Sequence, residues 1–326
     1  MSRKSAIGWT AAACLSAAAV AGCGSTVPGA APAFPTHSIT LVVPVSPGSS
    51  PDLTARHVAP LAAKALGHSV IVQNHTGGAG LVGLHDVASS AATGYTIGIG
   101  AVANFALAPH VTHGALTPTQ VDPVAEVASV PVVLFVKASS PIKSISGWVS
   151  YAKAHPELTV AVDKENSLLD LNAVLLGKAT GARLRVVPVG TGKQALSVLN
   201  GSAAAGVLSP SVLVPYLKSH EIRILGVFAK SPIAGLSAPT FWSQGIHVAA
   251  VPYQFLFAPP GTPHAVVSRL ASAVQKAVSA PSFQAYARSN LFSATFVGPT
   301  ALAAQLHRDY TYYGQVLSQL HAGSAS

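Results

Sequence analysis

Two loops in the first third of the chain have the composition of an anion-binding site. Residues 46–50 (Ser-Pro-Gly-Ser-Ser) follow a β-branched run at 39–44 and precede an expected helix with Ser50 as N-cap and Pro51 at its first position. The free N–H groups and positive dipole end of such a helix attract negative charge. The glycines within residues 77–80 let backbone amides approach a ligand closely. The two loops therefore predict an anion-receptive cleft.

Motifs for cofactor, metal or catalytic chemistry are weaker. Gly78-Ala-Gly-Leu-Val-Gly83 matches a dinucleotide fingerprint, but it lacks the acid expected about 20 residues later, since the nearest acids are Asp86 and Asp122. His110 and His113 have no cysteine or paired carboxylate beside them, which a zinc site would require. The sequence contains no G-x-S-x-G nucleophile elbow. We therefore expect no cofactor, no metal site and no catalytic residue.

The composition limits the class of protein. Of 326 residues, 50% are hydrophobic and only 9% are charged, so the chain is not intrinsically disordered. Both cysteines, Cys14 and Cys23, lie near the N-terminus, which excludes a disulfide scaffold. The chain is basic, but its densest basic stretch is residues 183–185 (Arg-Leu-Arg), so nucleic acid is not an expected partner. A chain of this length favours two lobes over one.

The N-terminus carries an export pattern. A positive start and an apolar run at 6–20 predict a signal peptide over residues 1–22. Val20-Ala-Gly-Cys23 resembles the bacterial lipobox, in which cleavage precedes a cysteine that is then lipidated. The alternative is ordinary signal cleavage that leaves Cys23 as a free thiol. Residues 23–36 are expected to hold the lipobox cysteine and a Pro-rich tether, which places the protein in the periplasm or on the outer face of the cytoplasmic membrane.

Strand–loop–helix units repeat along the chain and predict an α/β fold with two comparable halves. Apolar, β-branched runs alternate with helical periodicity, which is typical of sheets that bind ligands at the carboxyl ends of parallel strands. We expect lobe I to comprise residues 37–126 plus about 221–250. We expect lobe II to comprise residues 127–220 plus about 251–326.

Five blocks in a fixed order point to a known family. The first, Val-Val-Pro-Val-Ser-Pro-Gly-Ser-Ser-Pro-Asp-Leu-Thr-Ala-Arg at 42–56, matches the pattern V-V-P-[FY]-x-P-G-G-x-x-D-x-x-A-R. The second, at 73–83, matches E-N-R-P-G-A-G-G-x-x-G in part, and the others stand at 94–100, 123–131 and 257–263. Together these blocks resemble the Bug-type substrate-binding proteins of tripartite tricarboxylate transporters.

The resemblance implies a two-lobed periplasmic-binding-protein fold of the type II, Venus-flytrap kind, with a mixed, mainly parallel sheet in each lobe. It further implies a receptor that closes over a di- or tricarboxylate or a related small organic anion and delivers it to membrane permease subunits. We expect the protein to be a monomer. Carried over by position, the ligand contacts are Pro47, Gly48, Ser49, Ser50, Asp52, Gly78, Gly80, Ser167, Gly190 and Thr191. For Asp52 an equal alternative is a favourable interaction with the helix dipole.

The sequence departs from the family pattern mainly in the second half. Ser49 replaces a loop glycine in the first block. Residues 164–170 (Lys-Glu-Asn-Ser-Leu-Leu-Asp) replace G-x-G-S-S-x-H, and residues 187–191 lack the family's tyrosine and lysine. Lobe I therefore keeps the family's carboxylate-binding pattern better than lobe II, and the sequence does not identify the ligand. A sensor for a signalling partner and an enzyme that acts on a small carboxylate are the alternative functions.

Overall fold

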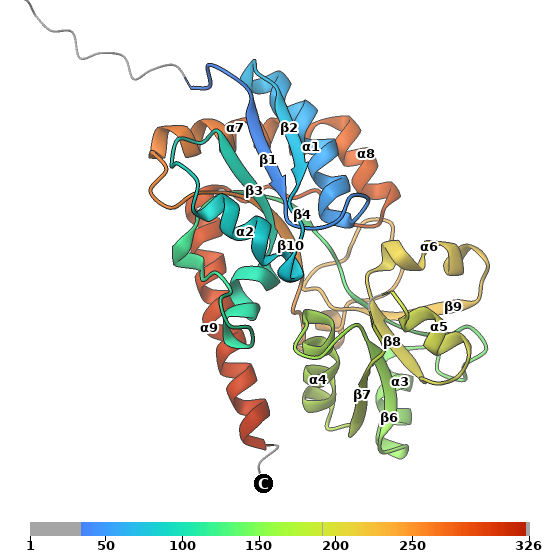
Figure 1. The fold of residues 1–326 in the computed structure, drawn as a ribbon. Coiled ribbons are helices and arrows are strands. Elements are labelled where there is room, and N and C mark those ends of the chain that lie inside the picture. The colour runs from blue at the N-terminus through green and yellow to red at the C-terminus, as the bar shows by residue number, and fades with distance from the viewer. Residues whose placement is uncertain (1–33, 191, 324–326) are drawn as a thin grey trace, which may run out of the picture. The chain divides into compact units, whose positions relative to one another are not determined.

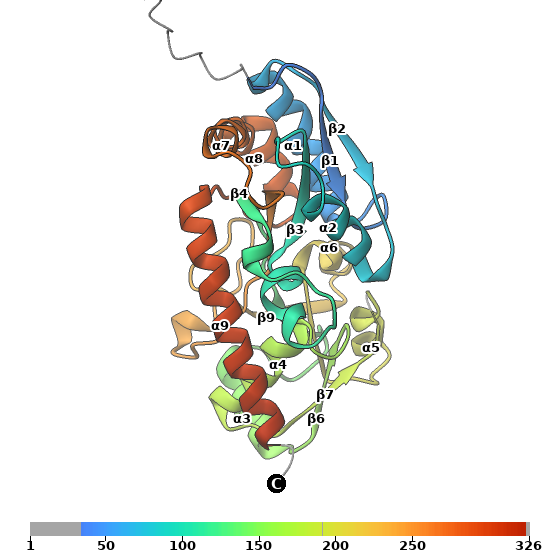
Figure 2. The same cartoon turned by 60° about the vertical axis from the view of Figure 1, so that its left-hand side comes forward.

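The apolar runs of the sequence form two five-stranded sheets, and helices cover each sheet (Figure 1, Figure 2). The computed structural model describes residues 34–190 and 192–323. The predicted signal peptide, Cys23, most of the tether and Thr191 lie outside these residues. Within them, no helix has both the length and the apolar composition to cross a membrane.

The sheet of lobe I has the strand order β2-β1-β3-β10-β4. Its β1 pairs in parallel with β2 and β3, whereas β10 runs antiparallel to both β3 and β4. In this register Leu41 stands opposite Val72 on one side and Ile97 on the other. The strands are β1 (Ile39–Val43), β2 (Val70–Asn74), β3 (Thr96–Ala101), β4 (Asp122–Ser129) and β10 (Tyr253–Ala258).

Glycines in β3 make room for aromatic side chains of β10 and of the segment that follows β3. A Cβ atom placed on Gly98 would lie 2.5 Å from the ring of Phe257, which is fully buried. A Cβ atom on Gly100 would lie 2.5 Å from the ring of Phe105. The two aromatic rings stack edge to face with centroids 5.1 Å apart. The small residues of β3 thus allow β10 to enter the middle of the sheet.

The helices of lobe I come from both ends of the chain. Ser49, not Ser50 as predicted, is the N-cap of α1, because Ser50 already has helical geometry. Gly67 ends α1 in the left-handed conformation. The longer helices are α1 (Ser50–Leu66), α2 (Leu81–Ala88), α7 (His264–Ser279), α8 (Pro281–Ser289) and α9 (Pro299–Gly323). Single-turn segments are η1 (Gly78–Gly80), η2 (Ala103–Leu107), η3 (Ala108–His110) and η4 (Pro118–Gln120).

The sheet of lobe II has the strand order β7-β6-β8-β5-β9. The pairs β6–β7 and β6–β8 are parallel, and β5 runs antiparallel to β8 and β9, so this sheet is mixed like the first. Its strands are β5 (Val133–Lys137), β6 (Leu158–Val162), β7 (Leu184–Pro188), β8 (Ala205–Leu208) and β9 (Ile222–Val227). Its helices are α3 (Ile145–Ala154), α4 (Leu168–Thr180), α5 (Gln194–Leu199), α6 (Pro210–Lys218) and the short η5 (Trp242–Gln244).

The predicted lobe boundaries after residue 220 are wrong. Residues 221–250 were expected in lobe I, but β9 pairs with β5 in the lobe II sheet. Residues 251–326 were expected in lobe II, but β10 lies in the lobe I sheet and α7 packs against α1 and β4. Apolar periodicity marks where strands occur but not which strands they pair with. The chain therefore passes between the lobes after β4 and again between β9 and β10.

Helix α9 (Figure 2) shares an apolar cluster with residues of both lobes. Leu302 and Leu306 of α9 are fully buried with Phe105 and other lobe I residues. Leu168 and Leu171 of α4 belong to the same apolar cluster, which also contains Val316 and Leu317 near the end of α9. This cluster joins α4 of lobe II to α9 and lobe I.

Asn172 adds a polar link between α4 and the segment that leads into β10. The side chain is fully buried, and its Nδ2 donates to the carbonyls of Leu168 and Ala250, each at 2.8 Å. Its Oδ1 accepts a hydrogen bond from the N–H of Ala250 at 3.1 Å. One amide thus satisfies both backbone groups of a buried residue between the lobes.

We predict that Asn172→Ala lowers the free energy of unfolding by about 2–4 kcal/mol, because it leaves the N–H and C=O of Ala250 buried without partners. Chemical denaturation measures this loss. The matched control is Asn200→Ala, at an exposed asparagine whose oxygen bonds only Ser202, and it should cost far less. Equal effects of the two substitutions would contradict the role given to Asn172.

Candidate functional site

The predicted anion-binding loop lies at the carboxyl end of β1 and leads directly into α1. Gly48 adopts a φ of +81°, which lets the chain turn ahead of the helix. Pro47, Gly48 and Ser50 are exposed, and Ser49 is half-buried. The Ser49 side chain makes no capping hydrogen bond, so the first N–H groups of the helix are not blocked by it.

A buried carboxylate holds this loop in place. Asp52 is only 1% exposed, and its Oδ2 accepts hydrogen bonds from the Gly48 N–H at 2.8 Å and Arg56 Nε at 2.9 Å. Its Oδ1 accepts one from Asn74 Nδ2 at 2.9 Å, and the same nitrogen donates to the carbonyl of Val45. Burial alone would raise the pKa of Asp52, but the bonds from Arg56, Gly48 and Asn74 outweigh it and lower the pKa. Asp52 thus holds the loop in place through its hydrogen bond with the Gly48 N–H.

Gln254 of β10 reaches the same loop and was not among the predicted site residues. Its side chain is 5% exposed, and Nε2 donates to Ser50 Oγ at 3.0 Å. Among the described residues, neither Gln254 Oε1 nor the buried Ser49 Oγ has a hydrogen-bond partner. Buried polar atoms without partners carry a free-energy cost that a ligand or water can remove. A polar residue in the apolar run Tyr-Gln-Phe-Leu-Phe-Ala was the signal that could have found Gln254.

The second glycine loop packs against the first. Gly77, Gly78 and Gly80 all have positive φ, as does Ala79 between them. A Cβ on Gly80 would lie 3.3 Å from the carbonyl oxygen of Pro44, and one on Gly83 would lie 2.5 Å from that of His75. Gly80 is buried, whereas Gly78 is exposed. These glycines therefore allow close backbone packing at the end of β1, and Gly78 stays open to a ligand.

In lobe II, Ser167 and Gly190 are organised around Asp163. Ser167 is the N-cap of α4: its Oγ accepts a bond from the Asp170 N–H at 3.1 Å and donates to Asp163 Oδ1. The Gly190 N–H donates to the backbone carbonyl of Asp163 at 2.9 Å. Burial raises the pKa of Asp170, with Asp163 and Glu165 adding to the shift and the bond from the Asn166 N–H opposing it.

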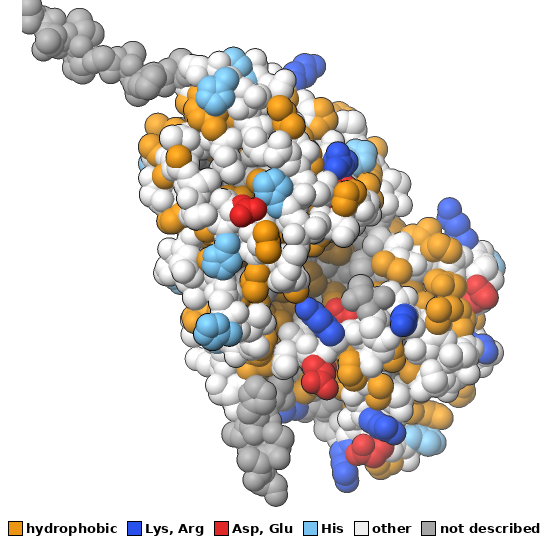
Figure 3. Space-filling view, in the orientation of Figure 1, with side chains coloured by type: hydrophobic (Ala, Val, Ile, Leu, Met, Phe, Trp, Pro, Cys, Tyr) orange, Lys and Arg blue, Asp and Glu red, His pale blue; other side chains and the backbone are white. Residues whose placement is uncertain are grey.

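A cavity of about 250 Å³ lies between the lobes. Lobe I contributes Ala79, Leu81 and apolar residues of η2 and η3, and lobe II contributes the turn from Asp163 to Leu169 at the start of α4. Pro252, in the segment entering β10, also lines it. The space-filling view shows the recess between the two lobes, with charged side chains near it (Figure 3). The lobe I side of the cavity is mostly apolar, with Asn104 and Thr112 as polar residues, and the lobe II side carries Asp163 and Lys164.

The structure brings together only some of the predicted contacts. Ser167 lines the cavity, and so does Ala79 between Gly78 and Gly80. The loop at 46–50, Asp52 and Gly190 do not line it, and Thr191 lies outside the described residues. No group of His, Cys, Asp and Glu within the described residues could hold a metal ion. The first-lobe and second-lobe contacts thus form two separate groups on either side of the cleft.

Known proteins are similar to this chain in sequence and in fold. The family described as "Tripartite tricarboxylate transporter family receptor" matches residues 54–305. Protein BugT of Bordetella pertussis is 28% identical over 268 residues, covering 79% of this chain and 82% of BugT. A TctC solute-binding protein from Polaromonas superposes with a TM-score of 0.79 at 24% identity over 88% of this chain and 99% of that chain. An R. palustris protein solved with adipate gives 0.74 at 27% identity over 87% and 97%.

Two lobes, each a mixed sheet covered by helices, with a cleft between them are the architecture of two-lobed solute-binding receptors. Within that class, the chain belongs to the receptor family of the tripartite tricarboxylate transporters. This confirms the family and the fold that the five sequence blocks predicted. It also confirms the predicted receptor function over an enzyme, because the matched family is described as a receptor family.

The Asp52 network generates a pH-dependent prediction. Because its pKa in the folded protein is below the ordinary value of 3.8, Asp52 stabilises the fold above that pH, and the contribution is lost as pH falls through the folded-state pKa. Asp52→Asn should therefore lower the free energy of unfolding at pH 7 by about 2 kcal/mol. Its difference from wild type should shrink in more acidic solution.

Thermal unfolding across the acid range measures this effect. The control is Glu165→Gln, which removes an exposed carboxylate. A constant difference between wild type and Asp52→Asn down to strongly acidic pH would show that the charge of Asp52 does not stabilise the loop.

Proposed function

We propose that this receptor captures a small organic carboxylate between its lobes and passes it to membrane permease subunits. The observation that carries the proposal is the loop at 46–50. It is exposed at the start of α1 and held in place by Asp52. Its Ser49 Oγ and the neighbouring Gln254 Oε1 are buried and have no hydrogen-bond partner among the described residues. A carboxylate at this point would receive backbone N–H groups and the positive end of the helix.

The proposed ligand contacts are those expected from the sequence, with Gln254 added. Gly48, Ser49 and Ser50 would hold the carboxylate, Pro47 and the glycines 78 and 80 would shape the loops around it, and Asp52 would act by positioning the loop. From lobe II, Ser167 with Gly190 and Thr191 would approach on closure. Gln254 Oε1 accepts hydrogen bonds, so it would bind a bridging water or a hydroxyl of the ligand.

The cavity between the lobes, which Ala79 of the second glycine loop and Ser167 line but the loop at 46–50 does not, favours a ligand with a short hydrocarbon body. Its lobe I side is mainly small and aliphatic, with Leu81, Leu107 and Val111, and also carries the polar residues Asn104 and Thr112. The volume of about 250 Å³ fits a molecule of modest size. The R. palustris relative was solved with adipate, a dicarboxylate with an aliphatic chain. A di- or tricarboxylate is accordingly the proposed ligand class.

Binding is tested by thermal shift and calorimetry with malate, adipate and citrate as probes, because a ligand that prefers the folded state raises the melting temperature. Gly48→Val with Ser50→Ala should weaken binding by about 10- to 100-fold, since the strained loop loses its amide geometry and a hydroxyl. Gln254→Leu should also weaken it. The matched control is Gly201→Val, at a glycine with a φ of +82° and equally open space around its Cβ.

Unchanged affinity in the loop variants would remove residues 46–50 from the site. Equal weakening by Gly201→Val would show that the effect is one of general strain. If none of the probes binds wild type, the carboxylate proposal fails.

We further propose that the protein is exported through its signal peptide, works as a monomer and is anchored by lipid on Cys23. Cys23→Ser should move it from the membrane to the soluble exported fraction, because acyl chains contribute about 0.8 kcal/mol of membrane affinity per buried CH₂ group. Fractionation followed by immunoblotting measures the distribution. The control is Cys14→Ser, within the predicted signal, which should leave anchoring unchanged. A wild-type protein already in the soluble fraction would contradict the anchor.

A further inference from the structure

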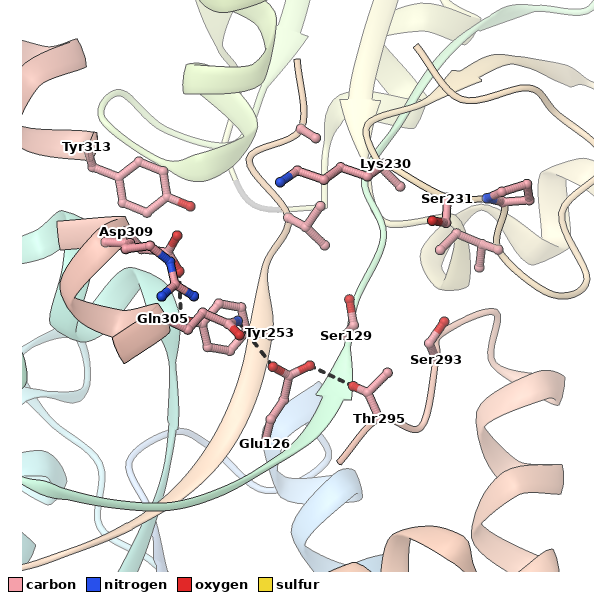
Figure 4. A pocket seen from close by; sticks show the side chains of 16 residues that line it. Glu126, Ser129, Lys230, Ser231, Tyr253, Ser293, Thr295, Gln305, Asp309 and Tyr313 are labelled. Atoms are coloured by element: carbon pink, nitrogen blue, oxygen red, sulfur yellow. Dashed lines mark hydrogen bonds between the residues drawn. The ribbon is translucent and has the colours of Figure 1, made fainter. Parts of the chain in front are cut away.

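A second and larger cavity lies beside the segments that connect the lobes (Figure 4). Its volume is about 480 Å³. Its walls are the end of β4, residues 229–233 after β9, residues 249–253 before and into β10, the strand-like stretch at 293–295, and α9. Pockets of this size hold small molecules. None of its lining residues lines the cavity between the lobes.

One segment of the chain, residues 251–253, lines both cavities. Pro252 lines the cleft cavity, whereas its neighbours Val251 and Tyr253 line the second cavity. Successive residues of an extended segment point to opposite sides, which explains the alternation. The second cavity is therefore separate from the cleft cavity, and at this point one stretch of chain divides the two.

Two carboxyl groups form one side of this cavity. Glu126 is 4% exposed and accepts hydrogen bonds from Thr295 Oγ1 at 2.6 Å and Gln305 Nε2 at 3.3 Å. Asp309 accepts one from the Tyr253 hydroxyl at 2.7 Å. Burial raises the pKa of both acids. Among the described residues, neither has a Lys, Arg or His nitrogen within ion-pair distance.

Two cations face the same space. Lys230 extends into the cavity from the lobe II side, toward Asp309 and Tyr313 (Figure 4). Its ammonium lies 5.3 Å from the centre of the Trp242 ring. Arg308 lines the cavity from α9, next to Asp309. In the described part of the chain, neither cation forms an ion pair. The cavity thus holds two positive and two acidic side chains that do not neutralise one another at contact distance.

This charge pattern selects for a ligand with both signs. A simple anion would meet Lys230 and Arg308 but would also lie against Asp309. A simple cation would have the opposite difficulty. A zwitterion can place a carboxylate on the cations and an ammonium on the acids at the same time. The hydroxyls of Ser129, Ser293 and Tyr313 add neutral hydrogen-bonding groups to the wall.

We propose that this cavity is a second binding site, which takes a small zwitterion of the α-amino acid type. Its carboxylate binds Lys230 and Arg308, and its ammonium binds Asp309 beside Glu126. Because the walls belong to the segments that pass between the lobes, the occupied cavity favours one arrangement of those segments. The zwitterion and the cleft ligand therefore change each other's affinity by the same factor.

The experiment is isothermal titration of the full exported chain with each of the common L-α-amino acids. For any that binds, the matched probes are the acid without its amino group and the amine without its carboxylate. We expect saturable binding of at least one amino acid and no comparable binding of either half-molecule. Arg308→Gln and Asp309→Asn should each weaken binding by about tenfold or more. The control Arg269→Gln, at an arginine outside the cavity, should leave it unchanged.

The double variant Gly48→Val with Ser50→Ala separates this site from the cleft. Amino acid binding that survives in this variant and falls with Arg308→Gln supports the second site, whatever the carboxylate screen shows. Binding lost in the loop variant and unaffected by Arg308→Gln and Asp309→Asn would assign the amino acid to the cleft and overturn the proposal. Failure of every amino acid to bind wild type would overturn it as well, as would equal binding of the acid that lacks the amino group.

Discussion

The return of the chain into the first sheet is the constraint on which the other features depend. After completing lobe II with β9, the chain comes back as β10 and enters between β3 and β4, where Gly98 leaves room for Phe257. An antiparallel strand in the middle of a sheet has partners on both sides, so it cannot move without breaking two ladders. This strand places Gln254 against the anion-binding loop and the Tyr253 hydroxyl on Asp309. One strand thus serves both the cleft and the second cavity.

The few acids of this chain fall into two electrostatic situations. Asp52 is buried with an arginine and two further donors, and its pKa is lowered. Glu126 is buried nearly as deeply, but its partners are a hydroxyl and an amide, and its pKa is raised. A paired buried charge stabilises a loop, whereas a buried carboxyl without a cation leaves free energy to be gained from a ligand. In a chain with only ten acids, this difference separates a structural carboxylate from a candidate binding group.

The sequence predicted local features better than long-range ones. The glycine at position 48, the helix after it and the fold family follow from motifs that are contiguous in the chain, and only the N-cap moved by one residue, from Ser50 to Ser49. The lobe assignment after residue 220 failed because Val227 and Phe255 belong to equally apolar runs, and nothing in either run specifies its partner strand. Gln254 was missed for the same reason, since its contact with Ser50 spans 204 residues. The pairing of Asp52 with Asn74 also requires two strands to be neighbours before it can be seen.

The apolar cluster that contains residues of α4 and α9 limits how far the two lobes can separate. A motion that swings lobe II away would pull Leu168 and Leu171 out of this cluster and expose buried hydrocarbon to water. Asn172 would move with α4 and carry the segment at Ala250 with it. Opening of the cleft therefore costs free energy in proportion to the apolar area that leaves this cluster, so the cluster limits the width of the open cleft.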